Sequence, residues 1–157
     1  MTRRIYVVRH ARAGDRERWT EADRLRPLTR LGERQARALA RPLRAAGVRR
    51  VVSSPYVRCL DTMRPFGEAR CVPVARDDAL AEGASHRAVR ALLGRLPDAT
   101  ALCTHGDIIA GLLDAAMRGG VALPSRRRLA KASIWILDVG AHGTIERARY
   151  RPPPTLT

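Results

Sequence analysis

The chain has few aromatic residues, almost no lysine and no long apolar run. Aromatic side chains make up 4% of its 157 residues, and Lys131 is the single lysine among 30 basic residues. No apolar run approaches the roughly 20 residues that a bilayer span requires. The N-terminus, Met1 to Arg4, enters the apolar stretch Ile5 to Val8 without the hydrophobic region and cleavage site of a signal peptide. We therefore expect a cytoplasmic protein with no membrane partner.

Cysteine is scarce as well. The three cysteines, Cys59, Cys71 and Cys103, are an odd number, and their spacing fits neither a disulfide framework nor a C-x-x-C zinc site. We expect each of them to be a buried free thiol. The sequence also lacks a P-loop and a G-x-G-x-x-G pattern, which argues against kinases, ATPases and dinucleotide-binding proteins. No cofactor is expected.

Acidic residues are outnumbered two to one. The chain has 30 Lys and Arg against 15 Asp and Glu, a formal net charge of +15, which usually indicates an anionic partner. The arginine excess is equally compatible with a GC-rich coding sequence. A nucleic-acid-binding module is one hypothesis, but the sequence lacks a helix-turn-helix signature, zinc-finger spacing and the aromatic residues of RNA-binding platforms. We expect no specific nucleic-acid partner.

The composition is that of one globular domain, with 45% apolar and 29% charged residues. We predict a single domain over residues 3–150 and a proline-rich, extended tail at 151–157. Short apolar runs alternate with helical stretches, and the pattern ends in a hairpin. The predicted fold is α/β with three layers, a mostly parallel mixed sheet with helices on both faces. The predicted strands lie near residues 5–8, 51–52, 72–74, 101–103, 134–137 and 145–150.

Helix start signals occur between the predicted strands. Thr29 is the expected N-cap of a first helix, whose apolar stripe of leucines four residues apart begins at Leu31. Ser54, followed by a proline, predicts the N-cap of a second helix. Ser85 is the expected cap of a third helix, and a fourth begins just after Gly106.

Two histidines directly follow predicted strands. His10 comes after the first strand, His105 comes after the strand at 101–103, and Arg58 lies in the first turn of the helix that follows a third strand. Ligands bind at the carboxyl ends of parallel strands, so these groups should lie close together at one edge of the sheet. Helix N-termini add unpaired N–H donors there, which predicts a site for a phosphoryl group. His86 and His142 have no such position and are expected to be ordinary surface or core residues.

Five short motifs occur in order along residues 5 to 113. They are Arg9-His10-Ala11, then Pro27-Leu28-Thr29 with Gly32, Gln35 and Ala36, then Ser53-Ser54-Pro55 with Arg58 and Thr62, then Leu80-Ala81-Glu82, and finally Thr104-His105-Gly106. This order and spacing resemble the signature of the histidine phosphatase superfamily, which has the phosphoglycerate-mutase-like fold. The short chain resembles the SixA type of phosphohistidine phosphatase. Residues 25–28 and 103–109 are also similar to the phosphatase-like domain found with some Nudix hydrolases.

The resemblance implies a metal-independent phosphatase that works through a phosphohistidine intermediate. His10 would be the nucleophile, Arg9 and Arg58 would hold the phosphoryl oxygens, and His105 and Gly106 would complete the phosphate-binding set. The two arginines would lower the pKa of His10 and keep it neutral near pH 7. The substrate would be a phosphohistidine protein or a small phosphomonoester such as a nucleotide. A catalytically inactive domain of the same fold is disfavoured, because every core motif position is present.

Glu82 is the candidate general acid and base, and Asp77 and Asp78 are alternatives close by in the sequence. Residues 12–19 are basic and depart from the mutase type, which argues against mutase activity and sugar-phosphate specificity. Three arginines at 126–128 are as compatible with a solvated loop as with a substrate clamp. We expect a monomer. The candidate substrate-binding residues are Arg12, Arg16, Trp19 and Arg26.

Overall fold

The computed structural model describes residues 1–124 and 128–156, and within them the chain forms a six-stranded mixed sheet. The order of its strands is β3-β2-β4-β1-β5-β6. Neighbouring strands from β3 to β1 pair in parallel, whereas β5 and β6 pair antiparallel. The predicted mixed α/β sheet is confirmed. The strands are β1 (Arg3–Arg9), β2 (Arg50–Ser53), β3 (Val74–Arg76), β4 (Thr100–Thr104), β5 (Ile134–Val139) and β6 (Ile145–Arg151).

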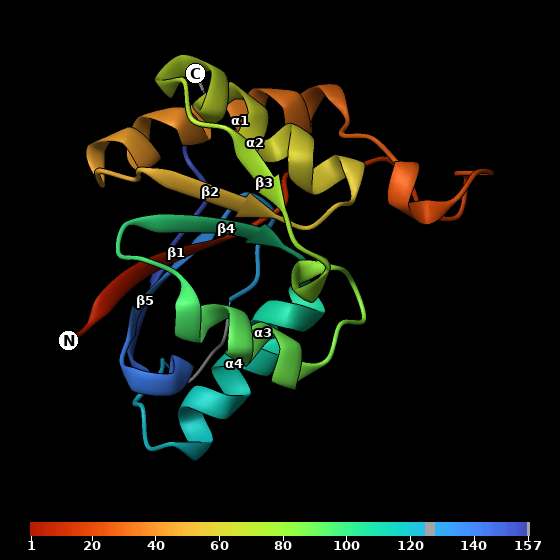
Figure 1. Ribbon diagram of the computed structural model, residues 1–157. Coiled ribbons are helices and arrows are strands. Elements are labelled where there is room, and N and C mark those ends of the chain that lie inside the picture. Colours follow the sequence, from red (N-terminus) through yellow and green to blue (C-terminus); the bar gives the residue numbers. More distant parts are fainter. Residues whose placement is uncertain (125–127, 157) are drawn as a thin grey trace.

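Helices cover both faces of the sheet, as the sequence predicts (Figure 1). The first two helices lie on one face and the last two on the other, which gives the three expected layers. In the described part of the chain, no helix is both long and apolar enough to cross a membrane. The helices are α1 (Arg30–Ala45), α2 (Val57–Arg70), α3 (His86–Arg95) and α4 (Gly106–Arg118), and the short 3-10 turns are η1 (Asp23–Leu25), η2 (Asp78–Leu80) and η3 (Ala141–Gly143).

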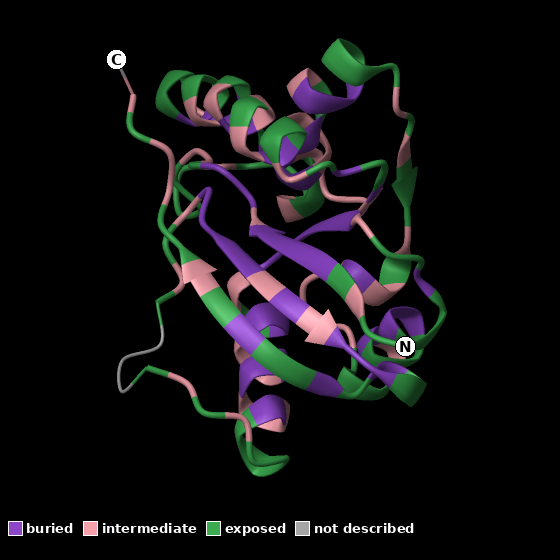
Figure 2. Cartoon of the chain, turned by 90° about the vertical axis from the view of Figure 1, so that its left-hand side faces the viewer, coloured by how far each residue is buried: buried purple, intermediate pink, exposed green. Residues whose placement is uncertain are grey.

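The side chains of β1 alternate between two apolar clusters. Ile5 and Val7 pack into the cluster shared with α3 and α4, and Tyr6 and Val8 pack into the cluster shared with α1 and α2. Because β1 lies in the middle of the sheet, both of its faces are buried. Figure 2 shows buried residues concentrated along the central strands. The two apolar clusters, one on each face of the sheet, hold the strand ends at which the candidate site forms in place.

Local hydrogen bonds explain where two helices begin. The Thr29 hydroxyl accepts from the Gly32 N–H of α1 at 3.0 Å, and the Ser85 hydroxyl accepts from the Ala88 N–H of α3 at 3.1 Å. Both predicted N-caps are therefore confirmed. The predicted start of the leucine stripe was wrong, since Leu31 is 39% exposed. Gly32 takes the buried position in that turn instead.

Two other predictions were wrong where α2 ends. β3 begins at Val74, because the Val72 N–H donates to the Gly67 carbonyl of α2 rather than to a sheet partner. Cys71 is exposed, since it is the C-cap of α2 and has a left-handed φ of 54°. The other two cysteines are buried free thiols, as predicted.

The end of the chain lies against the first helix. β6 includes Arg151, and Pro152 and Pro154 then line a hollow of about 460 Å³ together with Arg37 and Arg41 of α1. The division between a domain at 3–150 and a tail at 151–157 stays a prediction.

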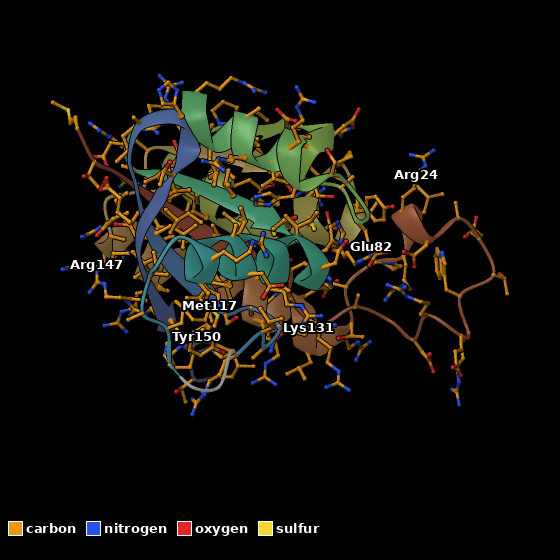
Figure 3. All side chains as sticks on the ribbon, turned by 90° about the horizontal axis from the view of Figure 1, so that it is seen from below. Arg24, Glu82, Met117, Lys131, Arg147 and Tyr150 are labelled. Carbon is orange, nitrogen blue, oxygen red and sulfur yellow. The ribbon has the colours of Figure 1, made fainter. Side chains whose placement is uncertain are left out.

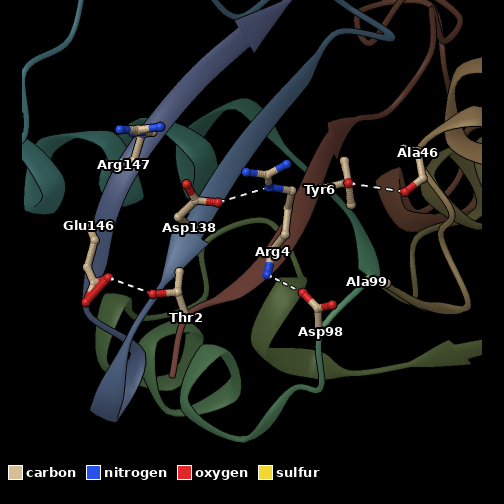
Figure 4. A pocket seen from close by; sticks show the side chains of 9 residues that line it. All are labelled: Thr2, Arg4, Tyr6, Ala46, Asp98, Ala99, Asp138, Glu146 and Arg147. Atoms are coloured by element: carbon tan, nitrogen blue, oxygen red, sulfur yellow. Dashed lines mark hydrogen bonds and ion pairs between the residues drawn. The ribbon is translucent and has the colours of Figure 1, made fainter.

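A larger hollow, of about 690 Å³, lies where β1 begins (Figure 4). Four of the five charged residues that line it are held by contacts within the fold. Arg4 Nε lies 3.0 Å from Asp138 Oδ1, and the Arg4 backbone N–H donates to Asp98 Oδ1 at 2.7 Å. The Thr2 hydroxyl donates to Glu146 Oε2 at 3.1 Å. The residues predicted to do chemistry lie at the opposite end of the strand.

Candidate active site

His10 directly follows β1 and is 4% exposed. Its backbone N–H donates to the Thr104 carbonyl at 3.1 Å, which ties the residue to the end of β4. Its Nδ1 lies 2.8 Å from the Ala11 carbonyl oxygen. A carbonyl oxygen can only accept a hydrogen bond, so Nδ1 carries the proton and Nε2 keeps its lone pair. Nε2 is therefore the nitrogen that can attack an electrophile.

Burial is the first cause of the unusually low pKa of His10. It lowers the pKa of the imidazole from 6.5 to about 2, and the nearby charges of Lys131, Arg58 and His105 act in the same direction. The predicted direction is confirmed, but the predicted cause is only partly right, since burial leads and Arg9 is not among the causes. The imidazole is neutral at pH 7.

Arg9 is held by the segment that precedes β5. Its backbone N–H donates to the Ser133 carbonyl at 3.0 Å, its carbonyl accepts from the Ala132 N–H at 3.0 Å, and its Nη1 donates to the Leu129 carbonyl. A Cβ on Gly106 would lie 3.0 Å from Arg9 Cζ. The lack of a side chain at position 106 therefore leaves room for the guanidinium.

Arg58, in the first turn of α2, has a completely buried side chain. Its Nη1 donates to the Asp23 carbonyl at 2.9 Å, and its Nη2 lies 3.0 Å from Asp23 Oδ2 and 3.6 Å from Glu82 Oε1. The guanidinium carbon lies 4.8 Å from the centre of the Tyr56 ring. Two segments far apart in the sequence thus meet at this arginine.

His105 is the N-cap residue of α4 and is 1% exposed. Its ring centre lies 5.4 Å from that of His10 and 4.7 Å from that of Tyr56. Its Nε2 lies 2.8 Å from Ser54 Oγ. The prediction that Ser54 caps α2 was wrong, because that helix begins three residues later. The Ser54 hydroxyl contacts the histidine and also accepts from the backbone N–H of Tyr56, the N-cap residue of α2, at 3.2 Å.

Three buried nitrogens of this site have no hydrogen-bond partner. Among the described residues, the buried side-chain nitrogen and oxygen atoms without a partner are Arg9 Nε, Arg58 Nε and His105 Nδ1. A buried polar group left unpaired costs about 1–3 kcal/mol, and native structures contain few of them. All three belong to residues around His10. This is the arrangement expected of a binding site for an anion with several oxygens.

A comparison with known families agrees with this geometry. Residues 5–87, more than half of the chain, match the model of the histidine phosphatase superfamily (branch 1). The chain belongs to the histidine phosphatase superfamily. Membership places it among the phosphoric ester hydrolases.

This histidine phosphatase is similar to proteins of known activity. It is 33% identical over 160 residues to the 8-oxo-(d)GTP phosphatase of Mycolicibacterium smegmatis, a match that covers 98% of this chain and 49% of the relative. The chain thus spans about half the length of that relative.

Solved structures of two other phosphatases have the same fold. One is the protein histidine phosphatase SixA in complex with tungstate, with a TM-score of 0.75, 18% identity, and coverage of 97% of this chain and 96% of that chain. The other is a mycobacterial glucosyl-3-phosphoglycerate phosphatase, with a TM-score of 0.71, 20% identity, and coverage of 99% and 100%. At these identities the likeness shows a shared fold and does not extend to the substrate.

Of the three candidate acids, Glu82 is the one that contacts a predicted phosphate-binding residue. Its side chain is 31% exposed, and its Oε1 lies 2.9 Å from Arg16 Nη2 and 3.6 Å from Arg58 Nη2. Asp77 instead caps η2 through a backbone N–H at 2.9 Å and faces an arginine of α3. Asp78 is exposed within η2. The catalytic role of Glu82 stays a prediction.

Residues 12–28, which we call the flap, contain the candidate substrate-binding residues. Arg26 is buried, with its Nε 2.9 Å from Asp23 Oδ1 and its Nη1 2.5 Å from the Gly14 carbonyl oxygen. These bonds connect residues within the flap. Because Asp23 also pairs with Arg58, they fasten it to the site as well.

The other candidates are placed at the edge of the site. Arg12 is exposed, Arg16 pairs with Glu82, and the Trp19 indole N–H donates to a flap carbonyl at 2.9 Å. Their contact with substrate stays a prediction. Of the arginine run, residues 126 and 127 lie outside the described residues, and Arg128 is exposed.

Sequence reasoning missed four residues that contact or surround the site. Lys131 is half-buried, and burial lowers its pKa to about 8, with Arg9 and three further arginines acting in the same direction. Its being the single lysine among 30 basic residues was an available signal. No local pattern distinguishes the other three. The missed residues are Asp23, Tyr56, Cys59, whose Sγ lies 3.6 Å from His105 Nε2, and Lys131.

Proposed function

We propose that the chain is a metal-independent phosphatase that transfers a phosphoryl group first to His10 and then to water. The observation that supports this most is the set of unpartnered buried nitrogens of Arg9, Arg58 and His105 beside a neutral imidazole. These groups supply fixed positive charge and directed donors, which is the role that a divalent ion has in other phosphatases.

The reaction has two steps. In the first, His10 Nε2 attacks phosphorus, an N–P bond forms, the bond to the leaving oxygen breaks, and the Glu82 carboxyl group donates a proton to that oxygen. In the second, the Glu82 carboxylate takes a proton from water, the water oxygen bonds to phosphorus, and the N–P bond breaks. Arg9, Arg58 and His105 hold the equatorial oxygens of a group that carries a charge of about −1.5 to −2.

Two substrate classes are compatible with this site. The resemblance of the short chain to the SixA type favours a phosphohistidine protein. The 33% identity to an 8-oxo-(d)GTP phosphatase over nearly the whole of this chain favours a nucleotide. Both classes present a terminal phosphoryl group to the same nucleophile.

The test replaces His10 with alanine. We expect turnover to fall by several orders of magnitude while the fold is kept, because the attacking atom is lost. A denaturing quench with labelled substrate should trap acid-labile, base-stable phosphate on the wild-type chain and none on the variant. The substrates are a phosphohistidine peptide, nucleotides and sugar phosphates, each with and without EDTA.

His86→Ala is the matched control, since His86 is exposed on α3. It should keep turnover within about twofold of the wild type. Full activity in His10→Ala, or complete loss of wild-type activity in EDTA, would refute the proposed function.

A further inference from the structure

Lys131 is fixed beside the nucleophile by its neighbours in the chain. On one side of it, the Leu129 carbonyl accepts from Arg9 Nη1. On the other side, the Ala132 N–H lies 3.0 Å from the Arg9 carbonyl oxygen and 3.3 Å from that of His10. Residue 131 is therefore bracketed by two contacts with the end of β1.

The lysine lies at the same end of the molecule as the other site residues. Figure 3 shows Lys131 and Glu82 toward that end and Arg147 toward the other. Arg147 lines the hollow where β1 begins. The side chain of Lys131 is half-buried, and its charge acts on His10, Arg9 and Arg58.

No acidic side chain compensates Lys131. Within residues 1–124 and 128–156 it forms neither an ion pair nor a hydrogen bond through its amino group. Burial and four arginines lower its pKa to about 8. A half-buried ammonium surrounded by like charges is unfavourable unless an anion lies next to it.

The carboxylates of the site and the phosphoryl group that His10 attacks do not neutralise the ammonium of Lys131. Asp23 pairs with two buried arginines, Glu82 lies 2.9 Å from a flap arginine and 3.6 Å from Arg58, and the charge of Asp107 acts on Arg9. One phosphoryl group, with a charge of about −1.5 to −2, balances Arg9 and the remaining charge of Arg58. Lys131 is in none of these pairs, so a phosphoryl group bound by Arg9 and Arg58 leaves its ammonium without an adjacent anion.

We propose that Lys131 binds a second phosphate carried by the leaving group, so that the chain prefers diphosphates to phosphomonoesters. The inference rests on the proposed function and selects the nucleotide class over phosphohistidine. In a diphosphate the two phosphorus atoms share one bridging oxygen, so the second phosphate is adjacent to the first. A lysine ammonium, with three donors, suits the several oxygens of such a group.

The chemistry of the first step follows from this substrate. His10 Nε2 bonds to the terminal phosphorus, the bond from that phosphorus to the bridging oxygen breaks, and the oxygen leaves on the second phosphate. The conjugate acid of this leaving group has a pKa of about 6, so it departs near neutral pH with little need of a proton. Water then releases orthophosphate from His10.

The first arm of the test measures binding without turnover. Methylenediphosphonate and methylphosphonate are titrated by calorimetry into the wild type, Lys131→Met and Lys131→Arg. We expect Lys131→Met to weaken the binding of methylenediphosphonate by about 10- to 100-fold, which is the effect of one charge-assisted hydrogen bond. The binding of methylphosphonate should weaken far less. Lys131→Arg should restore most of the diphosphonate affinity. Arg147→Met is the matched control, since it removes one positive charge at the opposite end and should change neither affinity beyond about twofold.

The second arm compares kcat/KM for a nucleoside diphosphate, inorganic pyrophosphate and p-nitrophenyl phosphate. The ratio of either diphosphate to the monoester should fall at least about tenfold in Lys131→Met. The more active diphosphate identifies the source of the second phosphate. Equal losses on all substrates, no loss on any, or a wild type that binds both phosphonates equally would overturn the inference. If no phosphate is trapped on His10, the proposed function fails, and the calorimetric result still decides the role of Lys131.

Discussion

The buried imidazole of His10 affects the stability of the fold as well as its chemistry. Its pKa is lowered to about 2 in the folded chain, against about 6.5 in an unfolded one. Between these values the unfolded state binds a proton that the folded state does not. The free energy of unfolding therefore falls as the pH drops from about 6.5 toward 2, by about 1.4 kcal/mol per pH unit for this one group.

We expect His10→Gln to flatten this dependence. Urea unfolding of the wild type and the variant between pH 6 and pH 4 should give free energies whose difference shifts in favour of the variant as the pH falls, by up to about 1.4 kcal/mol per unit. His86→Gln, on an exposed position, should run parallel to the wild type. Parallel curves for His10→Gln would show that the buried imidazole takes up a proton in the folded chain.

The role of Glu82 depends on the leaving group. An alkoxide, whose conjugate acid has a pKa near the value of about 15.7 for water, needs a proton to depart, whereas imidazole, with a pKa of about 6.5, needs much less. Glu82→Gln should therefore lower kcat/KM by about 10² to 10⁴ on an alkyl phosphomonoester and far less on an aryl phosphate or a phosphohistidine peptide. Steady-state rates below saturation near neutral pH measure this.

Asp77→Asn is the control for Glu82, because Asp77 is engaged as the cap of η2. It should lose activity to a similar, small extent on every substrate. Equal losses on good and poor leaving groups in Glu82→Gln would instead assign Glu82 to its ion pairs with Arg16 and Arg58.

At the scale of elements, the flap and α1 meet at one carbonyl oxygen. The Thr29 N–H donates to the Arg12 carbonyl at 3.0 Å, and a Cβ on Gly32 would lie 1.9 Å from the same oxygen. That oxygen belongs to the backbone and cannot rotate away as a side chain can. The glycine is therefore required by the close approach of the flap to the first turn of α1.

We expect Gly32→Ala to destabilise the protein by about 1–3 kcal/mol or more, the usual cost of overpacking, and to lower activity by displacing the flap. Gly111→Ala is the matched control, because Gly111 is also helical and a Cβ there would have nothing within 4 Å. It should be neutral or stabilising by about 0.5–1 kcal/mol. Chemical unfolding compares the two, and a Gly32→Ala protein as stable as Gly111→Ala would contradict this account.

Local signals were enough to predict most of the elements and the centre of the site. Caps such as Thr29 and Ser85 act within three residues, and apolar periodicity depends only on neighbouring positions. His10 and His105 were predicted to lie together because topology brings the ends of β1 and β4 side by side, and their rings are 5.4 Å apart.

Long-range contacts could not be predicted in this way. Asp23 meets Arg58 across 35 positions, and the Leu129 carbonyl meets Arg9 across 120, so only the folded chain shows them. The contact between Ser54 and His105 was missed, because a local pattern indicates only the bond of the Ser54 hydroxyl with the nearby Tyr56 N–H. Sequence patterns predict which elements form, but not which side chains meet between them.

For the whole molecule, much of the charge of +15 lies away from the site. The outer surface of α1 carries exposed arginines at spacings of three and four residues, which places them along one stripe. Such a stripe attracts polyanions without sequence preference. The stripe consists of Arg30, Arg34, Arg37, Arg41 and Arg44.

We predict weak, non-specific duplex DNA binding that falls steeply with salt. Replacing Arg34, Arg37 and Arg41 with glutamine should reduce binding at low salt and the slope of its salt dependence, while phosphatase turnover is kept. Fluorescence anisotropy at several salt concentrations measures both quantities. A sequence-selective, nanomolar complex at about 150 mM salt would favour the nucleic-acid-binding hypothesis.

The direction of β5 decides which part of the late chain reaches the nucleophile. Because β5 runs against β1, Ile134 pairs with Val8 and Val139 with Arg3, so the chain enters β5 at the edge where it leaves β1. Had the six residues of β5 run parallel to β1, the chain would have entered at the far edge, about 20 Å away at 3.3 Å per residue. The antiparallel direction of β5 thus places the loop that carries Lys131 beside His10. With the opposite direction, the loop would lie a full strand length away, at the hollow where β1 begins.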